Sequence, residues 1–597
     1  MNASDSAALR PARRVPAAVL GLLLLPIAAG AGPRAAPPVG PGVPGKTRPA
    51  RTVPPPDSVE ALFDSVRYLS DQLDVTRARV AETSIHGVPV DSLLAAYGRV
   101  RPRLVAALAR VDTAGLGTED RAALERMRRV THDRLGPGQG APAVSDVEAS
   151  PDCDYDAASY SAGPYGGVRP ALDALTRRVF ACYGKAAGAI VVGQDTLDRL
   201  TIFGLLGSTG DRARRERLFR ALGPVWRSVN GDDGPGSPYR RMVALRREAW
   251  GTGPTPMDRL ARGFGIDAAT AERWLVRALE AWRRALPDTL VEPWDYYRET
   301  GAAARRLSAQ IPRDSLLPIV RRFYRSLGAD PDDLGIHYDL EPRAGKYPIS
   351  YTTFGARPVR RGGRWVRAEP WVFAAYRTGG FSNLAELLHE TGHGVHIASI
   401  RARPAFDGWP DSDVFTEGIA DLAALEAYEP SWQEAFLGDS VPLAASLRSR
   451  YGAVMLDLAW SLFEIRVHRP DAPSPNAVWT EITRDYLGIR PHPELSWWAM
   501  RGQLVDSPGY MLTYALGAFL VADLRSTLQR RYGDFADGDP AWYGRVQEGL
   551  YRYGHALPAA EVTRRFLGRD PTPEALLEDL GRIGRAERPA GRGEGFV

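Results

Sequence analysis

The stretch NLAELLHETGHGVHIASI, residues 383–400, is the main evidence for the fold and the chemistry that we predict from this sequence. Its apolar residues have helical spacing, and Asn383 followed by Glu386 matches the capping box with which helices begin. On a helix starting at Asn383, His389 and His393 are one turn apart and project from the same face. Two imidazoles at that separation can bind one Zn²⁺. We therefore predict a zinc-binding helix here, rather than a core helix with incidental polar residues.

Two carboxylates complete the predicted site. Glu390 follows the first histidine directly, where it can take a proton from a water on the metal, as in the H-E-x-x-H motif. A catalytic zinc usually has a third protein ligand and one position for water. Glu417 and Asp421, in VFTEGIADLAALEAY (414–428), lie four residues apart on a second predicted helix. We expect Glu417 to bind the metal and Asp421 to accept a hydrogen bond from a ligating histidine.

Further residues of these two helices have predicted roles. Gly392 and Gly418 are small where the helices are expected to approach each other. His396 continues the histidine face and is expected to line a substrate cleft or to pack, but not to bind metal. The chain has nine histidines, and six stand alone in the sequence, so we expect surface or core roles for His86, His132, His337, His468, His492 and His555.

Most of the chain has helical periodicity, which predicts one large, mainly α domain. Apolar residues recur at three- and four-residue spacing from Ser58 onward, interrupted by a Gly-, Pro- and Ser-rich loop at 136–169. Two segments differ, YPISYTTFG (347–355) and RWVRAEPWVFAAY (364–376), because they are rich in aromatic and β-branched residues. They predict a short antiparallel pair beside the zinc-binding helix.

The N-terminus has the pattern of a targeting segment. Three arginines precede the apolar run VLGLLLLPIAAGA (19–31), which ends in an A-x-A cleavage pattern, so residues 1–31 are predicted to be a signal peptide. An uncleaved membrane anchor is the alternative. A Pro/Gly-rich linker at 32–56 is expected to precede a helical domain at 57–587, divided near residue 240 into an N-terminal lobe and a catalytic part, with a flexible tail at 588–597. The protein is therefore expected to be secreted or periplasmic, or anchored by its leader.

The charge and the cysteine content indicate which partners and which redox compartment to expect. The net charge of +5 arises from arginines scattered among acidic residues, without a compact basic run, so nucleic acid is not an expected partner. Cys153 and Cys182 are the two cysteines of the chain. An oxidising compartment would permit one disulfide between them, and two separate buried thiols are the alternative.

The motifs HETGH (389–393) and EGIAD (417–421) resemble those of the all-helical zinc metallopeptidases of the gluzincin type. This group includes angiotensin-converting-enzyme-like peptidyl dipeptidases, thimet-like oligopeptidases and Taq-type carboxypeptidases. The segment 371–396 is similar to the thimet-like pattern, 507–524 to the tyrosine-bearing segment of the carboxypeptidases, and 566–581 to the thimet-like ending. The resemblance spans about residues 190–580. It implies two helical lobes around a deep central cleft, one zinc per chain and peptide substrates.

The resemblance also assigns roles to individual residues. Tyr510 and Tyr514 match tyrosines that donate hydrogen bonds to the substrate or the developing oxyanion, with aromatic packing as the alternative. Arg501 lies near the position of a cation that binds the substrate's C-terminal carboxylate, with a surface arginine as the alternative. The family's histidine before the tyrosines is missing from MRGQLVDSPGY (500–510), where Gln503 is the substitute donor. The metal ligands and their partners are those already predicted: His389, His393, Glu417, Glu390 and Asp421.

These features predict a secreted zinc peptidase that hydrolyses short peptides. Release of a C-terminal dipeptide, release of a single C-terminal residue and internal cleavage all remain open, and Arg501 favours C-terminal release. A zinc protein that binds peptides without turnover is the rival, supported by the missing histidine. An aminopeptidase is a second rival, but no G-x-M-E-N-like segment precedes His389. The sequence does not indicate an oligomeric state.

Overall fold

The computed structural model describes residues 56–133, 152–197, 199–343, 346, 350–361 and 363–587. In these ranges the chain is mainly helical and has only small sheets, which confirms the predicted fold class. The predicted signal peptide, nearly all of the linker and the predicted tail lie outside the described residues. Among the described helices, none is long and apolar enough to cross a membrane. The predicted domain boundaries remain predictions.

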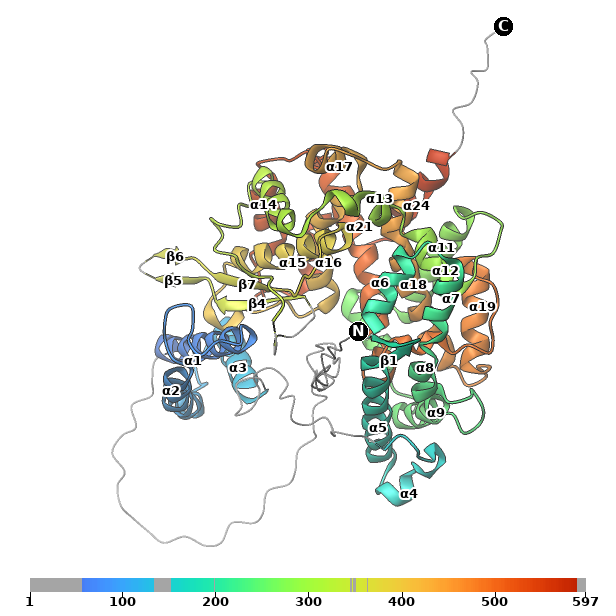
Figure 1. The fold of residues 1–597 in the computed structure, drawn as a ribbon. Helices are drawn as coiled ribbons and strands as arrows, with labels where there is room; N and C mark the ends of the chain where they lie inside the picture. Colours follow the sequence, from blue (N-terminus) through green and yellow to red (C-terminus); the bar gives the residue numbers. More distant parts are fainter. Residues whose placement is uncertain are drawn as a thin grey trace, which may run out of the picture.

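The helices form two halves with α21 (Met511–Tyr532) between them (Figure 1). In one half lie α14, the three-stranded sheet and α15–α17, and in the other lie α5–α9, α11, α12, α18 and α19. A single large hydrophobic core runs through both halves. The helices of the second half are α4 (Ala162–Tyr165), α5 (Val168–Gly188), α6 (Arg199–Ser208), α7 (Arg212–Arg220), α8 (Gly223–Asn230), α9 (Pro238–Trp250), α10 (Pro256–Phe264), α11 (Ala268–Arg284), α12 (Pro293–Thr300), α13 (Ala302–Leu307), α18 (Leu443–Val467), α19 (Pro475–Leu487) and α20 (Gln503–Asp506).

The first half carries the two helices that contain the predicted zinc motifs. These are α15 (Phe381–Ser399) and α16 (Asp413–Ala424), which pack against each other, and α16 packs in turn against α21. In Figure 1 the sheet, α14 and α17 lie around α15 and α16. The remaining helices of the chain's C-terminal part are α14 (Leu316–Ser326), α17 (Pro430–Leu437), α22 (Trp542–Val546), α23 (Ala559–Leu567) and α24 (Glu574–Glu587).

The zinc-motif helix begins two residues earlier than predicted. It starts at Phe381, and the residue that precedes its first turn is Gly380, which adopts φ 106°. Asn383 does not cap the helix, because its side-chain amide donates to the carbonyls of Thr378 and Gly379 instead. The predicted capping box is therefore wrong. An apolar residue, Phe381, begins the helix because it is fully buried in the core.

A three-stranded sheet lies against α15, and it contains the predicted antiparallel pair. Strand β4 (Tyr351–Ala356) pairs antiparallel with β7 (Glu369–Phe373). The sheet also contains β3 (His337–Asp339), parallel to β7, which was not predicted because three residues are too short for an alternation signal. Between β4 and β7 the chain forms a separate hairpin of β5 (Val359–Arg361) and β6 (Arg364–Val366), so 364–376 is not one strand. A further hairpin, β1 (Ile190–Val192) with β2 (Asp195–Leu197), follows α5.

Three N-terminal helices, coloured blue in Figure 1, lie beside this sheet. They are α1 (Pro56–Ala78), α2 (Val90–Arg110) and α3 (Thr118–Asp133), and they enclose a small core of their own. Ion pairs with little solvent exposure join α1 to the rest: Arg357 with Asp71 at 2.8 Å and Arg67 with Asp407 at 2.5 Å. On the other side of the molecule a disulfide joins Cys153 to Cys182 of α5, so the separate-thiol alternative is wrong.

Candidate active site

The helices α15 and α16 cross at Gly392, where their backbones nearly touch. A Cβ atom at this position would lie 2.2 Å from the carbonyl oxygen of Ala420, so any side chain would push the helices apart. The prediction of close approach at Gly392 is therefore confirmed. Gly418 faces α21 instead, where a Cβ atom would lie 3.4 Å from the oxygen of Gly517, an ordinary contact distance. The crossing brings the two zinc motifs, far apart in sequence, onto facing surfaces.

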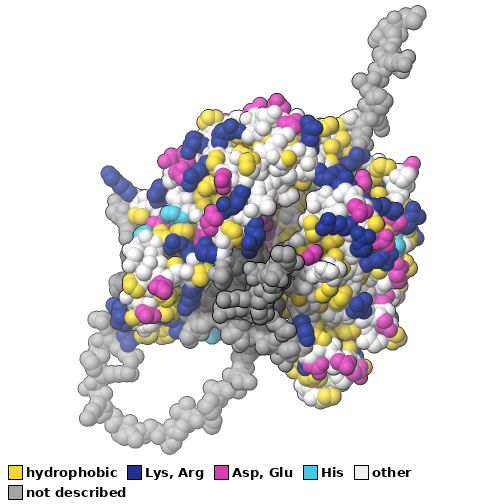
Figure 2. Space-filling view, viewed as in Figure 1, with side chains coloured by type: hydrophobic (Ala, Val, Ile, Leu, Met, Phe, Trp, Pro, Cys, Tyr) yellow, Lys and Arg dark blue, Asp and Glu magenta, His cyan; other side chains and the backbone are white. Residues whose placement is uncertain are grey.

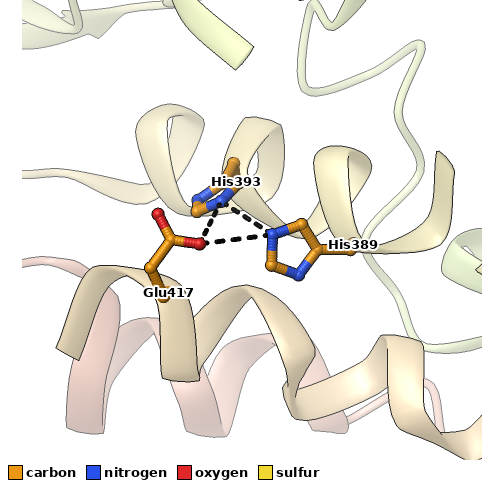
Figure 3. A group of neighbouring side chains, drawn as sticks. All are labelled: His389, His393 and Glu417. Atoms are coloured by element: carbon orange, nitrogen blue, oxygen red, sulfur yellow. Dashed lines mark hydrogen bonds and ion pairs between the residues drawn. The ribbon is translucent and has the colours of Figure 1, made fainter. Parts of the chain in front are cut away.

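The two histidines of α15 and the glutamate of α16 converge on one point (Figure 3). The Nε2 atoms of His389 and His393 are 3.1 Å apart, and Oε2 of Glu417 lies 3.5 Å from the first and 3.8 Å from the second. Ligand atoms bound at about 2.0–2.2 Å to one tetrahedral zinc lie about 3.3–3.6 Å apart. The donor types and their spacing therefore fit a zinc ion. Tetrahedral geometry would leave one position for a further ligand.

Asp421 orients the first histidine. Its Oδ1 atom lies 2.7 Å from Nδ1 of His389, so this nitrogen donates a hydrogen bond to Asp421 and Nε2 is the nitrogen that faces the cluster. The prediction that Asp421 pairs with a ligating histidine agrees with this geometry. Nδ1 of His393 is buried and has no hydrogen-bond partner in the described part of the chain, so on this side the ring is held by packing. The ring of Trp409 supplies that packing, edge to face at 5.6 Å.

Electrostatic coupling within the cluster favours the charged forms of its members in the metal-free protein. Burial alone would lower the pKa of His389, but Asp421 and Glu417 outweigh it and raise the pKa well above its usual range. Burial would likewise raise the pKa of Glu417, but interactions with the two nearby histidines hold it below its ordinary value. Glu417 is thus an ionised carboxylate at neutral pH, which is the form that binds a cation.

The cluster is partly enclosed by protein and partly exposed to solvent. The side chains of Glu417 and His389 are 38% and 23% exposed, although burial contributes to the pKa of both. Figure 2 shows the face of the molecule that is viewed in Figure 1. Basic and acidic side chains are interspersed over that face. Solvent can therefore reach the side chains of His389 and Glu417, whereas His393 is buried.

Glu390 lies beside the cluster with its carboxylate largely buried. Burial raises the pKa of Glu390, while the two histidines and a hydrogen bond from Thr352 lower it. That hydrogen bond, 2.7 Å from Thr352 Oγ1 to Oε2, comes from strand β4. The other oxygen, Oε1, has no hydrogen-bond partner among the described residues and is not among the fully buried atoms. Glu390 thus has one carboxylate oxygen in a hydrogen bond with Thr352 and the other without a partner among the described residues.

Tyr510 and Tyr514 lie at the start of α21, on the side of the cluster formed by Glu417. Their rings meet edge to face at 5.4 Å. Burial raises the pKa of both hydroxyls, and nearby Glu417 raises each further. Both hydroxyls therefore keep their protons at neutral pH and can donate hydrogen bonds. The sequence-predicted pair is thus brought to the cluster.

Arg501 and Gln503 lie next, close to Tyr514. Burial raises the pKa of Tyr514, whereas Arg501 and Gln503 lower it. Arg501 pairs with Asp457 of α18 and stacks on the ring of Trp460, with 27% of its side chain exposed. Gln503 is 3% exposed, and its side chain lies next to the Tyr514 hydroxyl, whose pKa it lowers. The two residues therefore lie on the Tyr514 side of the tyrosine pair, and the arginine charge is compensated by Asp457.

His396 is the predicted residue that lies farthest from solvent. It is fully buried between the rings of Trp409 and Tyr551, at 5.5 and 5.2 Å. Burial lowers the pKa of His396 to about 3, so the ring is neutral. This placement favours the packing alternative over contact with substrate.

Two site residues were not found from the sequence. Thr352 lies on β4 and Trp409 in the loop between α15 and α16, and both contact motif residues. An isolated threonine in a strand and an isolated tryptophan in a loop have no motif around them. Their position next to the site follows only from the tertiary fold.

Comparison with solved structures places the fold among helical metallocarboxypeptidases. The alignment with Trypanosoma cruzi metallocarboxypeptidase 1 covers 89% of this chain and 99% of that protein, with 15% identity and a TM-score of 0.50. The protein called CHT covers the same shares, with 14% identity and a TM-score of 0.52. The chain has the fold of these proteins. At this identity the likeness concerns the fold alone, and the angiotensin-converting-enzyme-like and thimet-like branches are not confirmed. No family model and no curated protein matches the chain.

Proposed function

We propose that the protein is a zinc-dependent peptidase acting on short peptides. The convergence of His389, His393 and Glu417 at zinc-ligand spacing, with the free Oε1 of Glu390 beside them, supports this proposal most strongly. A zinc that only stabilises structure is normally enclosed by four protein ligands. Here the described part of the chain offers three protein donors, two of them on partly exposed side chains, and the carboxylate of Glu390 stands beside them. These features favour a catalytic site.

In this proposal each residue has a defined task. Zinc, when held by His389, His393 and Glu417, would supply a Lewis acid for the scissile carbonyl and lower the pKa of water. Glu390 takes a proton from the attacking water at Oε1 and passes it to the leaving amine. Tyr510 or Tyr514 donates a hydrogen bond to the carbonyl oxygen as negative charge develops on it. Asp421 keeps His389 in the tautomer that presents Nε2.

We further propose release from the C-terminus of the substrate. Arg501 lies beyond the tyrosines, where a guanidinium can bind a terminal carboxylate. The fold shared with carboxypeptidases supports removal of a single residue, and dipeptide release or internal cleavage are alternatives that the test distinguishes. The disulfide between Cys153 and Cys182 supports an oxidising compartment, in agreement with the predicted signal peptide.

The test is mass spectrometry of the products that the zinc-loaded protein releases from a mixed peptide library. Single residues, dipeptides or internal fragments identify the mode of cleavage. Glu390→Gln is expected to keep zinc while losing cleavage, which separates chemistry from metal binding. Amidated and N-acetylated copies of one good substrate then show which end the protein needs. A zinc-loaded protein that cleaves no peptide in the library would refute the proposal.

One observation favours a second candidate, a zinc protein that binds peptides without turnover. The segment 500–510 contains Gln503 in place of the histidine that the resembling peptidases use as a donor. A neutral amide stabilises developing charge less than an imidazolium does. Retained peptide binding without products, measured by calorimetry beside the library experiment, would support this candidate. The retained Glu390 argues against it, because binding alone does not require that carboxylate.

A further inference from the structure

The hydroxyl of Thr352 is placed to hold Glu390 in one conformation. Its Oγ1 atom lies 2.7 Å from the carboxylate Oε2 of Glu390 and 2.8 Å from the backbone oxygen of the same residue. A hydroxyl has one hydrogen, so it donates to one of these two acceptors at a time. The contact with Oε2 is the shorter, and an ionised carboxylate is a stronger acceptor than a carbonyl, so the hydroxyl donates to Oε2 when Glu390 is charged.

This contact leaves the two carboxylate oxygens unequal. Oε2 is engaged by Thr352, whereas Oε1 has no hydrogen-bond partner within the described ranges. A glutamate side chain in a cleft would otherwise sample several rotamers. Holding Oε2 on the strand side therefore selects one rotamer of Glu390, in which Oε1 stays without a hydrogen bond to the described residues while the carboxylate remains near His389 and His393.

The strand that carries Thr352 is fixed from both sides. Thr352 is paired with Val372 of β7, which is fully buried in the core. Three residues along the strand, the carbonyl of Gly355 accepts a hydrogen bond of 2.7 Å from Gln72 of α1. Thr352 is therefore a rigid support, because its backbone has little freedom relative to α15.

The neighbouring threonine provides an internal comparison. Successive residues of a strand point to opposite faces of a sheet, so Thr353 projects away from α15. No hydrogen bond involves the Thr353 side chain in the described structure, while Thr352 on the α15 side reaches two atoms of Glu390. The strand thus has no general need for a threonine hydroxyl, and the one on this face contacts the proposed general base.

We propose that Thr352 is a positioning residue that orients the carboxylate of Glu390, so that Oε1 is the oxygen that exchanges protons with the substrate and water. The role rests on the proposed peptidase function. It predicts a contribution to the rate of the chemical step and little contribution to substrate binding, because Thr352 acts through Glu390.

The experiment compares three variants with the parent, all zinc-loaded. Thr352→Val keeps the shape and loses the hydroxyl, Thr352→Ser restores the hydroxyl, and Thr353→Val removes the hydroxyl from the opposite face. Thr352→Val is expected to lower kcat about tenfold or more, with KM within about twofold. Thr352→Ser should recover most of the parent's kcat, and Thr353→Val should match the parent. Zinc content by mass spectrometry and the melting temperature are measured for each variant.

The outcomes separate this inference from the function on which it rests. A parent that cleaves no peptide refutes the peptidase, whatever the variants do. If the parent is active and Thr352→Val has an unchanged kcat, the positioning role is wrong while the peptidase stands. Equal losses in Thr352→Val and Thr352→Ser would also overturn it, because packing and not the hydroxyl would then matter. Loss confined to Thr352→Val, at parental zinc content, supports it.

Discussion

The carboxylate of Asp421 lies 2.7 Å from Nδ1 of His389, on the opposite side of the ring from Nε2, which faces Glu417. The glutamate and the aspartate come from the same helix, one turn apart, so α16 contacts both edges of one imidazole. This contact fixes both the tautomer and the orientation of the ring. The second histidine, His393, has no such partner at Nδ1 among the described residues, so the two rings are supported in different ways.

Replacing Asp421 by asparagine should weaken zinc binding without removing a ligand. The amide accepts a weaker hydrogen bond and lacks the negative charge that stabilises a ligating imidazole. We expect zinc affinity to fall about 10- to 100-fold. Competition with a chromophoric chelator measures the change. Glu434→Gln, on the exposed face of α17, is the charge-matched control and should bind zinc like the parent. An unchanged affinity in Asp421→Asn would show that the ring is held by other contacts.

Zinc binding should release about one proton near pH 7. The pKa of His389 is raised well above its usual range, mainly by Asp421, so the metal-free protein carries a proton there that zinc must displace. The pKa of Glu417 is lowered, so this ligand releases none. Zinc affinity should therefore fall as pH falls. Calorimetry in two buffers of different ionisation enthalpy counts the protons, and a count of zero would contradict the raised pKa.

The same shift affects the stability of the metal-free protein. A raised pKa in the folded state means that protonation of His389 favours folding. This contribution is complete below the unfolded pKa, about 6.5, and is lost as pH rises through the higher folded pKa. Denaturation of the metal-free protein, prepared with a chelator, should show a free energy of unfolding that decreases as pH rises across this window. Asp421→Asn should flatten that dependence, since it removes the main partner of the protonated ring.

The sequence predicted that His389, His393 and Glu417 lie together because they belong to two short helical motifs. Spacing of three and four residues on a helix determines which side chains share a face, so His389 and His393 follow from local geometry alone. Gly392 marked where the second helix approaches. The start of α15 was mispredicted because burial of Phe381 outweighs the local capping preference of Asn383. Local signals thus located the site but not its boundaries.

What the sequence could not predict are the contacts made by distant elements. Thr352 reaches Glu390 from a strand whose register depends on β7, and Trp409 reaches His393 from an irregular loop. Neither contact has a periodic signal, because each is set by how the sheet and the loop pack on α15. The compensation of Arg501 by Asp457 is likewise a contact between separate helical segments.

Removing the hydroxyls of Tyr510 and Tyr514 one at a time should identify the oxyanion donor. Loss of one such donor costs about 100-fold or more in kcat. We expect one Phe variant to show this loss with little change in KM, and the other to show a smaller effect. Tyr532→Phe, at the far end of α21, is the control. If both Phe variants cleave at the parental rate, neither tyrosine is the oxyanion donor.

Gly392→Ala should disturb both the fold and the metal site. The added Cβ would lie 2.2 Å from a backbone oxygen of α16, so the helices must separate. Overpacking of this kind costs about 1–3 kcal/mol, and separation would carry Glu417 away from the histidines. We expect a lower melting temperature and loss of zinc. Gly98→Ala in α2 is the matched control, because nothing lies within 4 Å of its Cβ position, and it should stabilise the helix slightly.

The pairing of Arg501 with Asp457 determines how a test of carboxylate binding must be designed. Arg501→Gln alone would leave Asp457 without its cation, and burial already raises the pKa of that aspartate. The double variant Arg501→Gln with Asp457→Asn removes both charges and avoids an unpaired one. If Arg501 binds the substrate's terminal carboxylate, KM for free-ended peptides should rise about 10- to 100-fold in the double variant, since hydrogen bonds to charged groups contribute about 1.5–3 kcal/mol. Cleavage of amidated peptides, slow in the parent, should not change further. An equal effect on free-ended and amidated peptides would assign Arg501 to structure and leave the carboxylate to another cation.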